Sequence, residues 1–180
     1  FEEIVWDKKS DYSFKETLLP ISDTILYFTE SDTRLPEPQK PRLIFLRACE
    51  LNALKRLDEM YLHNGPADSY YQQVRSKAKF ILMGCDRSFP SCFCVSMGTN
   101  KSEDYSMAVR FGEGELSLDV KDDAFAPYFE GKNETGFKPE YVEKNQLTVD
   151  VPEIPNKEVL TKLKNHPMWN EYNKRCKIGR

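Results

Sequence analysis

The fold-determining residues are RLIFLRACELNALKRLDEMYL, positions 42–62, and KFILMGCDRSFPSCFCVSMG, positions 79–98. Each stretch contains a short apolar run near its start, at 43–46 and 80–83, which indicates a buried strand. Strand, helix and strand in succession predict two parallel strands joined by a right-handed crossover. We therefore expect a mixed α/β fold, with a central, mostly parallel βαβ sheet flanked by helices. The intervening helix is predicted from apolar residues at helical spacing: Leu51, Leu54, Leu57 and Tyr61.

Cysteines follow both predicted strands. Cys49 comes after the first apolar run and Cys85 after the second. In a parallel sheet, ligands bind beyond the carboxyl ends of the strands. Cys92 and Cys94 follow on a loop that Pro90 can turn back toward the same edge. The topology therefore predicts that four thiols, widely separated in sequence, meet at one edge of the sheet.

The remaining segments predict a hairpin, several short elements and a division into two parts. Alternating residues around a glycine-bearing turn favour a β-hairpin over 105–120. Prolines and charges indicate a linker at 31–41. We expect an α/β domain over residues 1–155 and a helical segment over 156–180. Further expected elements are an edge strand or displaced arm at 1–12, helices at 69–78, 122–129, 157–165 and 168–175, and a strand at 147–151.

Length, charge and cysteine content narrow the class of protein. The 180 residues suffice for one domain with a real core. The net charge of −3, without a basic stripe, gives no footprint for nucleic acid. No apolar run approaches the roughly 20 residues that span a bilayer. An odd count of five cysteines without an export signal favours the reducing cytoplasm, where clustered thiols bind metal or do redox work. Because the chain starts at Phe1 without methionine, we expect a piece of a longer protein.

Four thiolates suit a tetrahedral zinc ion or the irons of an iron–sulfur cluster. Their spacing matches neither the paired knuckles of a zinc ribbon nor a ferredoxin run. Cys49 stands at the start of a helix, where free N–H groups favour a thiolate. Arg47 and Arg87 are placed to offset the negative charge of a cluster. A single cysteine at a strand end is more often a small core residue, but burial does not explain Cys92 and Cys94 in a polar loop.

Two alternatives stay open on the residues alone. The same four cysteines can bind zinc, or nothing, in a domain that serves as a docking scaffold. A thiol-redox protein using Cys92 and Cys94 is a third interpretation, although the usual C-x2-C spacing is absent. A Cys49→Ala variant separates these interpretations, because a dithiol pair survives the change and a four-ligand cluster does not.

Several strings resemble one known family. They are RACELNAL at 47–54, GCD at 84–86, CFCVSMGTNK at 92–101 and HPMWNEYNKRC at 166–176. Together they resemble the iron–sulfur electron-transfer subunit of anaerobic sulfite reductase. That family is part of a wider group of iron–sulfur electron-transfer proteins that includes the sulfhydrogenase beta subunit. The likeness extends from about Leu18 to Cys176.

The resemblance implies a cytoplasmic complex in which this subunit carries electrons between a flavin/nicotinamide subunit and a sirohaem subunit that reduces sulfite to sulfide. It also implies that Cys176 matches the first cysteine of a following ferredoxin-like part, although Gly179 stands where the next ligand is expected. Our leading expectation is therefore an electron-transfer subunit that is not catalytic alone. We expect a [4Fe–4S] cluster on Cys49, Cys85, Cys92 and Cys94, with Arg47 and Arg87 nearby.

Overall fold

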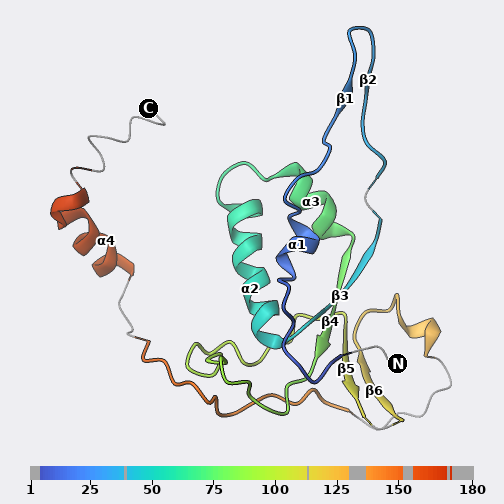
Figure 1. The fold of residues 1–180 in the computed structure, drawn as a ribbon, viewed down its shortest axis with the longest axis vertical. Helices are drawn as coiled ribbons and strands as arrows, with labels where there is room; N and C mark the ends of the chain where they lie inside the picture. Colours follow the sequence, from blue (N-terminus) through green and yellow to red (C-terminus); the bar gives the residue numbers. More distant parts are fainter. Residues whose placement is uncertain are drawn as a thin grey trace. The chain divides into compact units, whose positions relative to one another are not determined.

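The computed structural model describes residues 5–38, 40–112, 114–129, 137–151, 156–169 and 171 (Figure 1). The chain divides into two compact units, Phe1–Val149 and Asp150–Arg180. Among the described residues, the strands lie in the first unit, and the second unit carries helix α4 (Asn156–Asn165). The predicted boundary after residue 155 stays a prediction. None of the helices in the described residues is long and apolar enough to cross a bilayer.

A four-stranded sheet forms the centre of the first unit. Its order is β3 (Arg42–Leu46), β4 (Ala78–Met83), β5 (Met107–Phe111) and β6 (Leu116–Val120). The first three strands run parallel, and β6 pairs with β5 in the antiparallel sense. The mixed α/β fold with a mostly parallel βαβ sheet is thus confirmed, and so is the hairpin predicted over 105–120.

Helix α2 (Ala48–Asp58) is the predicted crossover between β3 and β4, and it continues into a π-helical turn, Glu59–His63. Helix α3 (Ser69–Ser76) follows, as predicted, and ends just before β4. The Asp58 carboxylate joins the two helices, because it accepts hydrogen bonds from Tyr71 Oη at 2.7 Å and Arg75 Nε at 2.9 Å. The largest fully buried side chains lie in β3, α2, α3, β4 and the short helix α1 (Lys15–Leu18): Leu18, Leu46, Leu51, Tyr71, Val74, Ile81 and Leu82.

The predicted linker at 31–41 is wrong in part. Strand β2 (Thr33–Arg34) lies within it and pairs antiparallel with β1 (Tyr27–Phe28). The turn between them is closed by side chains, since Thr29 Oγ1 accepts from the Asp32 backbone N–H at 3.0 Å. Polar turn residues of this kind hide a short hairpin from a search for apolar periodicity.

Two other short elements differ from expectation. Residues 147–151 form no strand, because the Val149 backbone N–H donates to Ser96 Oγ at 3.1 Å instead of joining a ladder. The predicted helix at 122–129 is reduced to one 3₁₀ turn, Ala126–Tyr128. Residues 5–12 form no strand, so the described part of the N-terminal segment is an arm. Most of the helix predicted at 168–175 lies outside the described residues.

Candidate functional site

The carboxyl ends of β3 and β4 lie side by side, because their parallel register pairs Leu46 with Leu82. Cys49 therefore sits in the first turn of α2, three residues beyond one strand end. Cys85 lies two residues beyond the other strand. The βαβ topology brings these two predicted site residues to the same edge of the sheet, as the sequence pattern required.

All four predicted cysteines are free thiols of intermediate burial. Burial raises the pKa of the Cys49 thiol to about 11, and the charge of Glu50 adds to the shift. Charges on Cys94, Cys85 and Cys92 raise the same pKa further. Because such effects weaken with distance, the four thiols belong to one electrostatic environment. Cys176 lies outside the described residues.

The thiols do not close around a single ion. In the described part of the chain, no three His, Cys, Asp or Glu side chains form a group that could hold one metal ion. Tetrahedral zinc, with Zn–S bonds of about 2.3 Å, requires sulfur atoms within roughly 4 Å of one another. A four-iron cluster takes its thiolates on different irons, so its ligands stand farther apart. As donors, four thiolates suit either zinc or an iron–sulfur cluster.

Arg47 is the charged residue that reaches these thiols. It stands immediately before α2, where its backbone N–H donates to Glu50 Oε2 at 2.8 Å and secures the start of the helix. Its Nη1 donates to Cys85 Sγ at 3.1 Å. Burial raises the pKa of the Cys85 thiol, and the Arg47 guanidinium opposes that shift. Arg47 is therefore placed to favour the thiolate form of Cys85.

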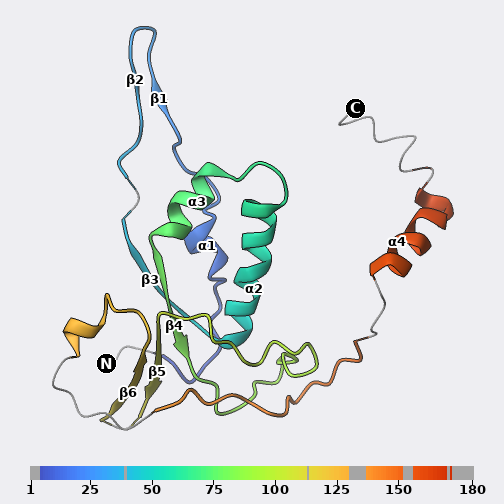
Figure 2. The ribbon, with the colours of Figure 1, turned by 180° about the vertical axis from the view of Figure 1, so that it is seen from behind.

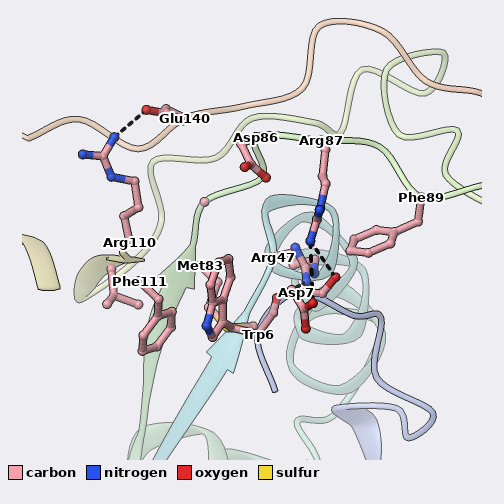
Figure 3. A pocket seen from close by; sticks show the side chains of 12 residues that line it. Trp6, Asp7, Arg47, Met83, Asp86, Arg87, Phe89, Arg110, Phe111 and Glu140 are labelled. Atoms are coloured by element: carbon pink, nitrogen blue, oxygen red, sulfur yellow. Dashed lines mark hydrogen bonds and ion pairs between the residues drawn. The ribbon is translucent and has the colours of Figure 1, made fainter. Parts of the chain in front are cut away.

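The N-terminal arm crosses the same edge. Arg47 Nη2 donates to the carbonyl oxygens of Trp6 and Lys8, at 3.0 and 3.2 Å. Arg87 does not contact a thiol. Instead its Nη2 donates to the Asp7 carbonyl oxygen at 3.2 Å (Figure 3). Both predicted arginines thus donate hydrogen bonds to the N-terminal arm, and of the two only Arg47 also contacts a cysteine.

Between the N-terminal arm (residues 5–12) and the strand ends lies a cavity of about 100 Å³ (Figure 3). Trp6 and Phe111 form an aromatic wall, with ring centroids 6.2 Å apart and planes inclined by 21°. On the opposite side, the Arg47 guanidinium lies 4.8 Å from the Phe89 ring centroid. Arg110, also at the rim, is paired with Glu140 at 2.6 Å. The cavity therefore places apolar surface directly beside the thiol edge.

Asn145 is a site residue that sequence reasoning missed. Its Oδ1 accepts from the Val95 backbone N–H at 2.6 Å, and its Nδ2 lies 3.5 Å from Cys94 Sγ and 3.4 Å from Ser88 Oγ. These contacts attach the loop that carries Cys92 and Cys94 (residues 86–99, the cysteine loop) to a segment about fifty residues further along the chain. No local pattern marks such an asparagine, because its partners are set by the tertiary fold.

Asn52 is a second missed residue. It lies on α2, and its Nδ2 donates to the carbonyl oxygens of Thr99 and Lys101, at 3.2 and 2.8 Å. The far end of the cysteine loop is thereby attached to the helix that carries Cys49. The sequence did contain a signal for Asn52, because it is a polar residue among the leucines of α2. A partly buried amide on such a helix needs hydrogen-bond partners.

Comparison with known proteins gives a limited likeness. The chain is 36% identical over 64 residues to sulfhydrogenase 2 subunit beta of Pyrococcus furiosus. The matched region is 34% of this chain and 18% of that protein. No protein-family model matches the chain. No solved structure matches it either. The comparisons therefore relate part of the chain to part of one sulfhydrogenase subunit.

Proposed function

We propose that this chain is an electron-transfer module of a multi-subunit oxidoreductase and that Cys49, Cys85, Cys92 and Cys94 hold an iron–sulfur cluster. One observation carries the proposal: β3 and β4 are parallel neighbours, so Cys49 and Cys85, which follow their carboxyl ends, lie at the same edge of the sheet. The partial similarity to a protein named as a sulfhydrogenase subunit supports the redox class. The resemblance of the cysteine strings to iron–sulfur subunits supports the cofactor class.

Cys49, Cys85, Cys92 and Cys94 would hold the cluster, and a [4Fe–4S] cluster bound there would supply one-electron transfer between a reduced donor and an oxidised acceptor. The chain's own residues bury the thiols and set their charge. Arg47 donates to Cys85 Sγ and brings positive charge, which would favour the reduced, more negative state of such a cluster and raise its potential. Asn145 Nδ2, 3.5 Å from Cys94 Sγ, adds a second donor.

The finer assignment follows from the resemblance to the iron–sulfur electron-transfer subunit of anaerobic sulfite reductase. On that basis the electrons come from a flavin/nicotinamide subunit and go to a sirohaem subunit that reduces sulfite to sulfide in the cytoplasm. This chain then conducts electrons and is not catalytic alone. The predicted division at residue 155 is part of the same proposal, with residues 156–180 leading toward a ferredoxin-like part.

A second candidate is a docking domain whose cysteines bind zinc or no metal. One observation favours its metal-free form: no described group of side chains is arranged to hold a metal ion. Metal analysis separates the two candidates. One zinc per chain without visible colour selects the docking domain, whereas iron with acid-labile sulfide selects the cluster.

The decisive experiment is anaerobic purification followed by reconstitution with iron and sulfide. We expect about four irons per chain and visible absorbance from the wild-type protein. Cys49→Ala should lose most of the iron, because a four-ligand set is broken. Cys176→Ala is the matched control, since the proposal leaves that cysteine out, and it should keep its iron. Colourless, iron-free wild-type protein after reconstitution contradicts the proposal.

A further inference from the structure

Residues 21–38, which we call the β1–β2 arm, stand apart from the sheet. Both views show the paired strands extending away from the end of the first unit where α1 and α3 lie (Figures 1 and 2). The cysteine loop lies at the other end of the unit in both views. At the base of the arm, Tyr70 Oη donates to Asp23 Oδ2 at 2.6 Å.

The arm presents large apolar side chains to solvent. Ile21, Ile25, Phe28 and Leu35 are 103, 73, 77 and 77% exposed. Single exposed hydrophobic residues are common, but several on one projecting element indicate an interaction site. A lone two-stranded hairpin is also marginally stable in water, so this one needs external packing to hold its form.

Beyond the base of the arm, no polar contact joins it to the rest of the described chain. Between residues 24 and 35, all of which are described, the hydrogen bonds and ring contacts stay within the arm. Asp32 and Thr29 close the turn, with the Thr29 backbone N–H donating to the Asp32 carbonyl at 2.7 Å. The Arg34 guanidinium lies 4.8 Å from the Tyr27 ring centroid. The apolar side chains are therefore left for a partner to cover.

The charge of the arm identifies the kind of partner. It carries four carboxylates, Asp23, Glu30, Asp32 and Glu37, against one guanidinium, Arg34. Two copies of so acidic an arm repel each other. Each strand is two residues long, so pairing with a second arm edge to edge adds few hydrogen bonds. A different polypeptide with an apolar groove and a basic rim matches both features.

We propose that the β1–β2 arm docks into an apolar groove, rimmed by Lys and Arg, on a different subunit of the same complex. The inference rests on the proposed membership of a multi-subunit complex and does not need the cluster. Because the arm and the cysteine loop occupy opposite ends of the unit, changes in the arm leave the thiols untouched (Figure 1).

The test is made on the full-length protein produced in its source organism. A photoreactive benzoylphenylalanine replaces Phe28, and the cross-linked peptides are identified by mass spectrometry. We expect cross-links to a different polypeptide, at a segment where apolar residues alternate with Lys and Arg. Cross-links to a second copy, to an acidic surface, or to nothing overturn the proposal.

A matched pair of variants measures the contribution of the arm. The double variant Ile25→Ser/Phe28→Ser should retain roughly a tenth or less of the co-purified, cross-link-identified subunit, because two central apolar contacts are removed. Met60→Ser is the control, since Met60 is 61% exposed and lies outside the arm. It should co-purify that subunit at the wild-type level. Equal yields for the two variants overturn the proposal.

Three further measurements support the interpretation. Glu30→Lys/Asp32→Lys keeps the apolar side chains and should slow association, most strongly at low salt. Iron that depends on Cys49, measured with and without Cys49→Ala, distinguishes the two proposals. Cys49-dependent iron with a dispensable arm refutes only the docking, and no Cys49-dependent iron with an arm-dependent partner refutes only the cluster. Urea midpoints within error of wild type show that the variants fold.

Discussion

The buried core and the cysteine edge of the first unit are held together by different forces. In the core, Leu46 and Leu82 pair across β3 and β4 and are at most 1% exposed. At the edge, half-buried thiols are surrounded by side-chain donors from distant segments, notably Arg47 and Asn145. Hydrophobic burial is non-directional and tolerant of detail, whereas hydrogen bonds depend on placement.

The difference separates folding from function. Loss of a core leucine leaves a cavity that weakens the whole cooperative unit. Loss of an edge donor loosens one loop while the sheet persists. We therefore expect core changes to act mainly on unfolding free energy, and edge changes to act mainly on the thiols and on local opening. Three predictions test this contrast, in order of expected size.

The largest effect is expected inside strand β3 itself. Leu46→Ala should cost about 2–5 kcal/mol of unfolding free energy, because Leu46 is 1% exposed and the site cannot refill. Leu43→Ala, on the same strand but 59% exposed, should stay within about 0.5 kcal/mol of wild type. Urea denaturation measures both. Equal losses at the two positions would show that the sheet is not packed as described.

The second effect is on the reactivity of Cys49 in metal-free protein. Its pKa is raised from 9.0 to about 11, so its thiolate fraction at pH 8 should be about 100-fold below that of an unshifted thiol. Alkylation by iodoacetamide, followed at Cys49 by mass spectrometry, should quicken about tenfold per pH unit until the pH nears 11.

The raised pKa of Cys49 also makes the stability of the folded protein depend on pH. The folded protein disfavours the thiolate, so the stability contributed at Cys49 is fully present below pH 9 and is lost as the pH rises through about 11. Protein unfolded in urea is the control, because its Cys49 should react at the ordinary rate. A folded Cys49 that reacts as fast as the unfolded one would remove the case for a buried thiol edge.

The smallest effect is expected at Asn145. Asn145→Ala removes the acceptor of the Val95 N–H and should cost about 1–2 kcal/mol. It should also speed proteolysis within residues 86–99, because the loop loses its fastening. Asn64→Ala, at an exposed turn, should change neither quantity. If the two variants behave alike, the loop is held by other contacts.

Much of the fold was predictable because it rests on local periodicity. The apolar runs at 43–46 and 80–83 became β3 and β4, and the helical spacing of Leu51, Leu54 and Leu57 became the buried face of α2. Parallel pairing followed from the crossover rule. The wrong predictions, at 31–41 and 147–151, concern short segments whose backbone is paired in ways that periodicity does not reveal.

The candidate site was predictable only in outline. The rule for strand ends correctly directs Cys49 and Cys85 to one edge. The same reasoning placed both Arg47 and Arg87 near the thiols. Of the two, only Arg47 contacts a thiol, because the Arg87 side chain donates to Asp7 of the N-terminal arm. The contact of the N-terminal arm with this edge, and the role of Asn145, were invisible, since their sequence separation from the cysteines exceeds any local pattern.

Amino-acid order alone was enough to establish the α/β architecture and the edge of the sheet to which two of the cysteines belong, because strand and helix periods are properties of neighbouring residues. The tertiary structure decided which donors face the sulfur atoms, how deeply the thiols are buried, and which apolar side chains stay exposed on the β1–β2 arm. Those outcomes depend on contacts between residues tens of positions apart, and only the packed chain brings such residues together.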